Sequence, residues 1–69
     1  MSETIDVNGE RRLLEDRLLV DLLRRQGIDP GRQGIAVAVD GAVVPRGEWA
    51  TRELRGGEQV EIVGAVQGG

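Results

Sequence analysis

The sequence predicts a small α+β domain in which a mixed sheet of four or five strands packs on one main α-helix. Two observations support this fold class: short alternating or β-branched segments are separated by Asn-Gly and Asp-Gly turn signals, and one stripe of leucines recurs at helical spacing. The chain has 69 residues, and a domain of that size buries only about 60% of the surface of its unfolded chain, which allows a single core. We therefore expect one domain over residues 1–69, with residues 64–69 as a flexible C-terminal tail.

The first expected element is a β-hairpin. Residues 4–7 alternate polar and apolar side chains, and residues 10–14 return the chain. Between them, Asn8 and Gly9 both tolerate positive φ angles, as a two-residue hairpin turn requires.

A helix is predicted over residues 17–26. Asp16 is expected to cap its start, and Gly27 is the expected left-handed terminator. The apolar positions fall on one stripe that faces the core: Leu18, Leu19, Leu22 and Leu23.

Further strands are predicted in the second half of the chain. Residues 34–39 are almost continuously apolar, as expected for a central strand that is buried on both faces. Asp40 and Gly41 then predict a tight turn into the short strand 42–44. Pro45 ends that strand because proline has no amide hydrogen to donate.

The remaining segments complete the fold. Residues 47–54 are typical of an irregular or single-turn helical connection, and Gly56-Gly57 turns the chain into the alternating final strand 59–63. A right-handed crossover would lay the helix over one face of the sheet. This order of elements is that of the ubiquitin-like β-grasp fold.

The composition excludes several classes of function. The chain contains neither Cys nor His, so it lacks the commonest nucleophiles and metal ligands, and we expect no metal site. The net charge is −3 with acidic and basic residues interspersed, so nucleic acid is not an expected partner. No apolar run approaches the roughly 20 residues of a membrane span, and residues 1–4 do not resemble a signal peptide, so we expect a cytoplasmic protein without a membrane partner.

Two pairs of carboxylates lie close enough in the sequence to be candidates for acid–base chemistry. Glu15 with Asp16, and Glu58 with Glu61, lie near turns and strand ends. Charged residues in such places are usually solvated, so we interpret all four as surface groups.

The chemistry is instead expected at the C-terminal carboxylate. Gly68 and Gly69 follow the last predicted strand after a short spacer. Because glycine has no Cβ, such an end can lie extended in a channel too narrow for side chains. There the Gly69 carboxylate can attack the α-phosphate of ATP to form an acyl-adenylate. Sulfur can then displace AMP and leave a thiocarboxylate.

An internal segment imitates such an end. Residues 54–57 read Leu-Arg-Gly-Gly, which matches the end of ubiquitin. We interpret this segment as a turn, because cleavage after Gly57 would remove Val60 and Ile62 and with them the final strand.

Several segments carry a family resemblance. They are Val7-Asn8-Gly9-Glu10, Val20-Asp21-Leu22-Leu23, residues 34–41, Val43-Val44-Pro45-Arg46-Gly47-Glu48-Trp49-Ala50, Val60-Glu61-Ile62-Val63 and Ala65-Val66-Gln67-Gly68-Gly69. Together they resemble the ThiS family, the sulfur carriers of thiamine thiazole synthesis. The Pro-Arg-x-Glu-Trp segment and the Ala-Val-Gln-Gly-Gly end are the most specific parts. Leu18 and Gly64 depart from the residues usual in that family.

The resemblance implies a co-substrate and not an enzyme. A ThiF-like adenylyltransferase would activate Gly69 with ATP and Mg²⁺, and a cysteine-derived sulfur donor protein would supply the sulfur. The thiocarboxylate would then pass its sulfur to a ThiG-like thiazole synthase. The carrier itself would bind no cofactor.

Candidates for partner contact are Arg46, Val63, Val66 and Gln67. The alternation along residues 60–63 turns Val63 outward near the tail, where an exposed apolar side chain can form a docking patch. Trp49 is expected to cap the core, with its indole N–H bonded to a partner group.

Two other hypotheses remain open from the residues. One is a carrier of the same chemistry for molybdopterin or another sulfur metabolite. The other is a β-grasp interaction module that does no chemistry. One extra residue after Gly69 separates the classes, because a module would keep its function and a carrier would lose it.

Overall fold

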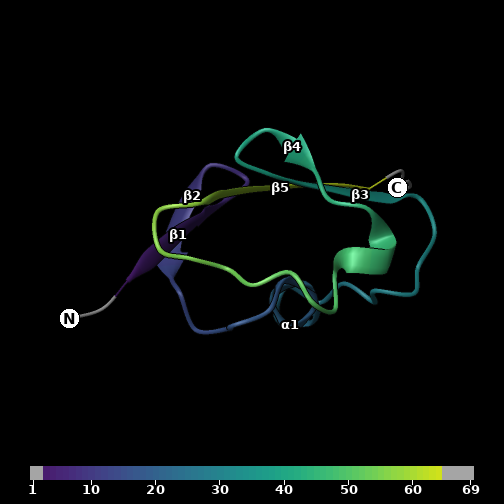
Figure 1. Cartoon of the computed structure of the whole chain (residues 1–69), viewed down its shortest axis with the longest axis horizontal. Helices are drawn as coiled ribbons and strands as arrows, with labels where there is room; N and C mark the ends of the chain where they lie inside the picture. The colour runs from purple at the N-terminus through teal and green to yellow at the C-terminus, as the bar shows by residue number, and fades with distance from the viewer. Residues whose placement is uncertain (1–2, 65–69) are drawn as a thin grey trace.

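The computed structural model describes residues 3–64, which form a five-stranded sheet with one α-helix against it (Figure 1). The sheet order is β2-β1-β5-β3-β4, in which β1 and β5 run parallel and the other pairs are antiparallel. This confirms the predicted fold class. The elements are β1 (Thr4–Val7), β2 (Glu10–Leu13), α1 (Leu19–Arg25), β3 (Ile35–Val39), β4 (Ala42–Val43), the 3-10 helix η1 (Arg46–Glu48) and β5 (Gln59–Gly64).

Both predicted tight turns are present. Asn8 and Gly9 have φ angles of 52° and 86°, and Asp40 and Gly41 have φ angles of 51° and 84°. Asn and Asp enter this left-handed region more readily than other side chains, because they are short and polar. The hairpins β1–β2 and β3–β4 therefore have the same turn sequence, a Val followed by Asn or Asp and then Gly.

The helix begins later than predicted. α1 starts at Leu19, and its N-cap residue Leu18 makes no side-chain cap. The amides of Leu19 and Val20 instead donate to backbone carbonyls of Arg52 and Trp49, at 2.9 and 3.0 Å. These tertiary hydrogen bonds satisfy helix-start donors that a capping side chain would otherwise serve.

The cap assigned to Asp16 is therefore wrong. Its carboxylate accepts two hydrogen bonds from Arg25, at 2.7 and 3.1 Å, and so is held at the other end of the helix. The predicted terminator is confirmed, since Gly27 follows the helix with a φ of 82°.

The hydrophobic core lies between α1 and the facing side of the sheet. Trp49 is 3% exposed and its Nε1 donates to the carbonyl of Val44 at 2.9 Å, as predicted for a core-capping indole. The fully buried side chains are contributed by β1, α1, β3 and β5: Ile5, Leu19, Leu23, Val37 and Val60. The helix stripe is confirmed for Leu19, Leu22 and Leu23, whereas Leu18 is half-buried beside the core.

The central strand is β5, so the prediction that residues 34–39 form it is wrong. β3 lies between β5 and the two-residue edge strand β4. Only alternate side chains of β3 are deeply buried, Val37 and Val39, while Ala36 is exposed. The apolar run predicted burial on both faces because alanine counts as apolar. Nothing in the described chain covers the outer face at Ala36.

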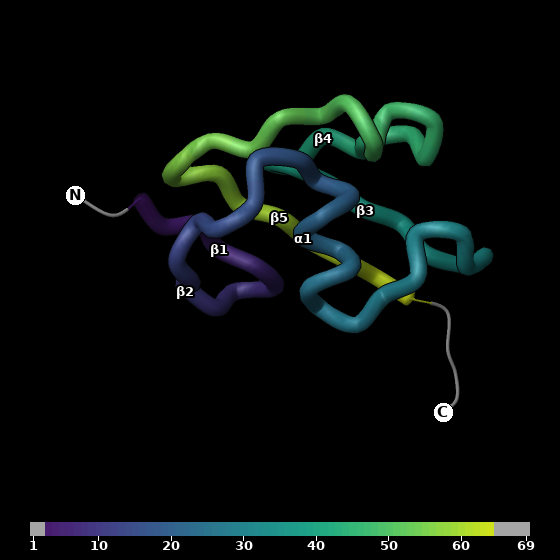
Figure 2. Tube along the Cα trace, turned by 90° about the horizontal axis from the view of Figure 1, so that it is seen from below, coloured from purple at the N-terminus to yellow at the C-terminus, as the bar shows by residue number. Residues whose placement is uncertain are grey.

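The connection from β4 to β5 runs back along the flank of α1 (Figure 2). It contains the single 3-10 turn η1, in agreement with the predicted irregular segment. The ubiquitin-like sequence at 54–57 is a turn, as predicted. Leu54 is buried and Gly57 has a φ of 88°. The Gly57 amide donates to the backbone carbonyl of Thr4 at 2.8 Å. Cutting there would detach the central strand.

Candidate functional site

The predicted reactive end follows β5. This strand extends one residue beyond the predicted one, to Gly64, and Val66, Gln67, Gly68 and Gly69 lie outside the described residues. Gly64 is paired with Ile35 of β3, and Val63 with Ala36. The strand that leads toward the chain end is thus held in the sheet up to the last residue described.

An apolar patch lies on the outer face of the sheet beside this strand end. Val63 is 65% exposed and Val43 is 74% exposed. Residues opposite one another in an antiparallel ladder point to the same face, and the ladders pair Ala36 with Val63 and Ala38 with Val43. We call Ala36, Ala38, Val43 and Val63 the outer-face patch; the charged Glu61, opposite Ala38, lies on the same face beside them. The predicted alternation of β5 is confirmed, because Val60 is buried and Val63 points outward.

Arg46 is engaged within the chain. Its guanidinium donates to the carbonyls of Pro30 and Arg32, the latter at 2.6 Å. It also lies over the Trp49 ring, 4.5 Å from the centroid. Arg46 therefore ties the 3-10 turn to the loop before β3, and that loop leads into Ile35, the partner of Gly64. We call these contacts the Arg46 brace.

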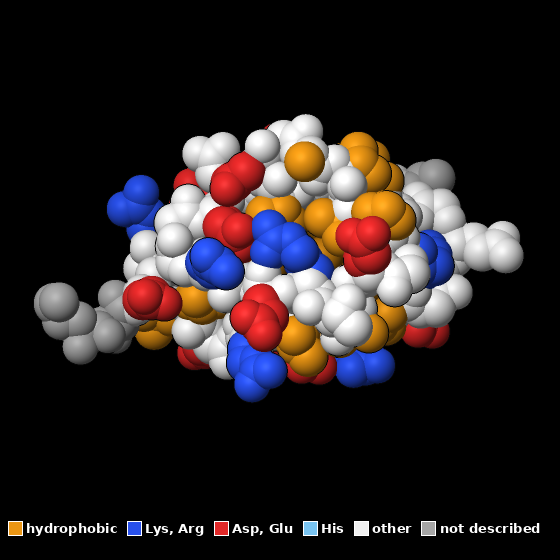
Figure 3. Space-filling view, viewed as in Figure 1, with side chains coloured by type: hydrophobic (Ala, Val, Ile, Leu, Met, Phe, Trp, Pro, Cys, Tyr) orange, Lys and Arg blue, Asp and Glu red, His pale blue; other side chains and the backbone are white. Residues whose placement is uncertain are grey.

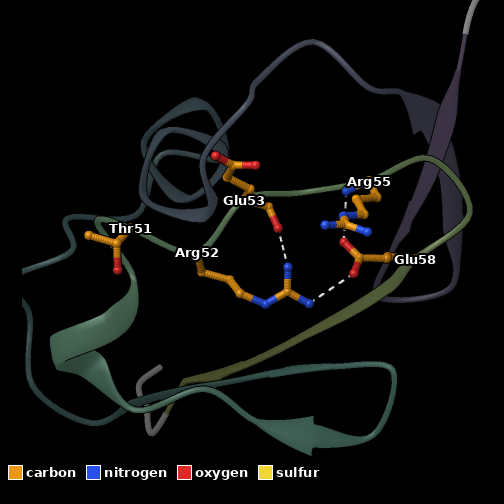
Figure 4. Close-up of a pocket in the computed structure, with 5 residues that line it drawn as sticks. All are labelled: Thr51, Arg52, Glu53, Arg55 and Glu58. Carbon is orange, nitrogen blue, oxygen red and sulfur yellow. Dashed lines mark hydrogen bonds and ion pairs between the residues drawn. The ribbon is translucent and has the colours of Figure 1, made fainter.

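A surface hollow lined by residues 51–53, 55 and 58 is polar (Figure 4). Arg52 donates to the Glu58 carboxylate at 2.8 Å and also to the carbonyl of Glu53. The other Glu58 oxygen accepts the Arg55 amide at 2.8 Å. Glu58 thus fastens the turn before β5, and no carboxylate pair suited to acid–base catalysis forms with Glu61. Glu58 is largely covered, so its interpretation as a solvated group is wrong.

The other carboxylate pair is also structural. Asp16 is largely covered, so its interpretation as a solvated surface group is also wrong; with Glu15 it contacts Arg25. The hydrogen bonds that Arg25 donates to Asp16, the negative charge of Asp16 and, least, the charge of Glu15 raise the pKa of Arg25 against an opposing effect of desolvation. Glu15 and Glu61 are exposed, as predicted.

Charges are mixed on the face drawn in Figure 3, where acidic and basic side chains alternate with apolar ones. Within residues 3–64, no group of three or more acidic, His or Cys side chains is placed to hold a metal ion. The described part of the chain also contains no helix long and apolar enough to cross a membrane.

Comparison with known proteins decides the family. The model of the ThiS family matches residues 3–69. The chain belongs to the ThiS family. A ThiS relative, the sulfur carrier protein ThiS of Thermus thermophilus, is 36% identical over 63 residues, which cover 91% of this chain and 95% of the relative. The crystal structure of the thiamine biosynthesis protein ThiS from Geobacter metallireducens has a TM-score of 0.76 at 20% identity, covering 96% of this chain and 99% of that one. This structural likeness confirms the β-grasp fold.

The ThiS match includes the two most specific of the resembling segments, the Pro-Arg-x-Glu-Trp stretch and the Ala-Val-Gln-Gly-Gly end. In the first stretch, Arg46 and Trp49 contact each other and close the core near η1. Sequence reasoning missed the side chains of Asn8 and Asp40, whose oxygens accept β5 amides. Their only signal was an Asn or Asp before Gly in a turn.

Proposed function

We propose that this chain is a sulfur carrier of thiamine biosynthesis whose reactive group is the carboxylate of Gly69. Membership of the ThiS family is the observation that supports this most directly, because the match extends over residues 3–69 and includes Gly68 and Gly69. The Thermus relative is named a sulfur carrier protein. The position of β5 agrees with the proposal, since a strand hydrogen-bonded on both sides leads toward that end.

Activation requires another protein. The chain has no Cys and no His, and a carboxylate is a poor electrophile. In the proposed first step a Gly69 carboxylate oxygen attacks the α-phosphorus of ATP, bound with Mg²⁺ in a ThiF-like adenylyltransferase. The bond between the α-phosphorus and the bridging oxygen breaks and pyrophosphate leaves. The product is an acyl-adenylate, a mixed anhydride in which AMP is a good leaving group.

Sulfur transfer then replaces AMP. A donor protein carries cysteine-derived sulfur as a persulfide. The terminal sulfur attacks the Gly69 carbonyl carbon, and AMP departs with the electron pair of the broken C–O bond. A thiol then reduces the resulting acyl disulfide, which releases the thiocarboxylate and leaves a disulfide on the donor side. A ThiG-like thiazole synthase consumes the thiocarboxylate. The carrier acts as co-substrate and holds no cofactor in this cycle, which we place in the cytoplasm.

Partner enzymes are proposed to dock on the outer-face patch. Val63 and Val43 are strongly exposed apolar side chains, and the small Ala36 and Ala38 between them allow close approach of a partner surface. Val66 and Gln67 follow along the chain and are proposed to enter the partner's channel. Arg46 contributes to this surface through its brace on the loop before β3.

The experiment is conversion of the intact carrier by a cognate adenylyltransferase with ATP, Mg²⁺ and a persulfide donor, followed by intact-protein mass spectrometry. We expect the mass of one oxygen to be replaced by that of one sulfur. The matched control carries one alanine after Gly69, which leaves the globular part unchanged and moves the carboxylate. It should fold like the wild type and remain unmodified.

The alternatives give different outcomes. Absence of sulfur incorporation with an enzyme that modifies its own carrier would eliminate the carrier hypothesis and leave an interaction module. Incorporation followed by use of the sulfur in molybdopterin synthesis, and not by thiazole synthase, would assign the chemistry to another product.

A further inference from the structure

The parallel ladder between β1 and β5 is short, and a side chain adds one hydrogen bond beyond its last backbone bond. The Asp6 amide donates to the backbone carbonyl of Glu58 at 3.0 Å, and the Asn8 amide donates to that of Val60 at 2.8 Å. In a regular parallel ladder the next bond would join the Ile62 amide to the backbone carbonyl of Asn8. Asn8, however, is already the first left-handed residue of the hairpin turn, with a φ of 52°.

The Asn8 side chain supplies the bond that continues this ladder. Its Oδ1 accepts a hydrogen bond from the Ile62 amide at 2.7 Å, across 54 residues of sequence. The amide oxygen thus stands where a strand carbonyl would otherwise be. Ile62 lies two residues before Gly64, so the bond holds the part of β5 from which the chain end departs.

A second turn residue provides a comparison within the same molecule. Asp40, also left-handed at a φ of 51°, holds β5 from its other side. Its amide donates to the Gln59 carbonyl at 2.8 Å, and its Oδ1 accepts the Gln59 amide at 2.9 Å. Asp40 therefore fastens the beginning of β5, whereas Asn8 fastens the strand near its end.

We propose that Asn8 is a positioning residue for the reactive chain end, because its side chain prolongs the β1–β5 ladder and limits opening of β5 at Ile62. The inference rests on the proposed function, in which Gly69 must enter a partner's active site. A strand end that is already ordered loses less conformational freedom on binding. Without the Asn8 bond, more of the chain must be ordered when the partner binds.

Asparagine suits both demands of this position. It tolerates the left-handed backbone, as glycine does, and it adds an acceptor oxygen that glycine lacks. It is also neutral. A shallow hollow beside the turn is lined by Asp6 and Glu61 among others, so a carboxylate at position 8 would add a third acid there.

The test compares Asn8→Gly with Asp40→Gly. Each variant keeps a residue that accepts positive φ and removes one side-chain acceptor from a β5 amide. Asn8→Asp restores an acceptor oxygen at the first site. Amide hydrogen exchange is measured by NMR for each β5 residue, thermal unfolding is recorded, and kcat and KM for adenylation are determined with the carrier as the varied substrate.

We expect Asn8→Gly to raise the exchange rate of the Ile62 amide about tenfold, the effect of losing one hydrogen bond. Its kcat/KM should fall roughly threefold or more, through KM. Asp40→Gly should lower thermal stability to a similar degree while its kinetics stay near those of the wild type. Asn8→Asp should recover the protection of Ile62.

Equal kinetics for the two glycine variants, with Ile62 exchange raised in Asn8→Gly, would overturn the positioning role and leave the bond purely structural. Unchanged exchange at Ile62 would overturn the bond itself. A wild-type chain that the adenylyltransferase does not modify contradicts the proposed function and with it the kinetic part of this inference. The exchange measurement still decides whether Asn8 holds the strand.

Discussion

Replacing Arg46 with alanine removes three interactions of one side chain: the hydrogen bonds to the carbonyls of Pro30 and Arg32 and the stacking over Trp49. Arg46 is exposed, so each contribution lies at the low end of its range. Stacking of an exposed cation on an indole contributes about 0.5 to 1 kcal/mol. Each hydrogen bond adds about 0.5 kcal/mol in a solvated position. We expect the free energy of unfolding to fall by about 1.5 to 2 kcal/mol.

That loss corresponds to a large change in melting temperature. The unfolding entropy of a globular domain is about 2.1 cal/mol/K per residue, so for this chain 1 kcal/mol shifts Tm by about 7 °C. Arg46→Ala should therefore melt about 10 to 14 °C below the wild type in a calorimetric or circular dichroism scan.

Arg46→Lys is the matched variant. Lysine keeps the positive charge and part of the stacking, but one ammonium cannot reproduce the planar fork that reaches two carbonyls. Its Tm should lie between those of the wild type and Arg46→Ala. A KM for adenylation measured well below both melting temperatures shows whether the same side chain also contacts a partner.

A shift of less than about 3 °C for Arg46→Ala would refute this reasoning. It would mean that the Arg46 brace adds no net stability. The role of the side chain would then have to lie in partner contact alone.

Three further variants test other parts of the molecule. Val63→Asp should raise the KM for adenylation without lowering Tm, because it charges the outer-face patch at a site that is 65% exposed. Leu13→Asp, at a similarly exposed apolar site on β2, serves as control. Equal KM values for the two aspartate variants would argue against docking there. Leu23→Ala removes a fully buried helix side chain, which costs about 2 to 5 kcal/mol and should leave so small a domain largely unfolded at 37 °C; a well-dispersed NMR spectrum at that temperature would contradict this. In Gly57→Ala the added Cβ meets no atom within 4 Å, but alanine must adopt a φ of 88°. Denaturant melts should show a loss of about 1 to 2 kcal/mol in the free energy of unfolding, and an unchanged midpoint would disprove the strain.

The turns and the strand alternation could be predicted because their causes are local. Asn8-Gly9 and Asp40-Gly41 carry their conformational preference in the residues themselves, and the structure confirms both positive-φ turns. The outward direction of Val63 follows from the period of two in any strand.

The wrong predictions concern long-range contacts. Asp16 has the residue type of a cap, but Arg25 binds its carboxylate, and the helix start is served by carbonyls of residues 49 and 52. Strand order was likewise hidden from the sequence, since the apolar run of β3 gave no sign that β5 would lie at the centre. The same holds for the Asn8 bond to Ile62, which joins residues 54 positions apart.

The placement of β5 between β1 and β3 also has a mechanical consequence. A pull on its C-terminal end acts along the strand, so hydrogen bonds to both neighbours resist in shear together. An edge strand under the same force would be held by the hydrogen bonds of one neighbour only. In the proposed function, a partner that binds the chain end would pull on a strand held from both sides, so the fold would resist unravelling under that load.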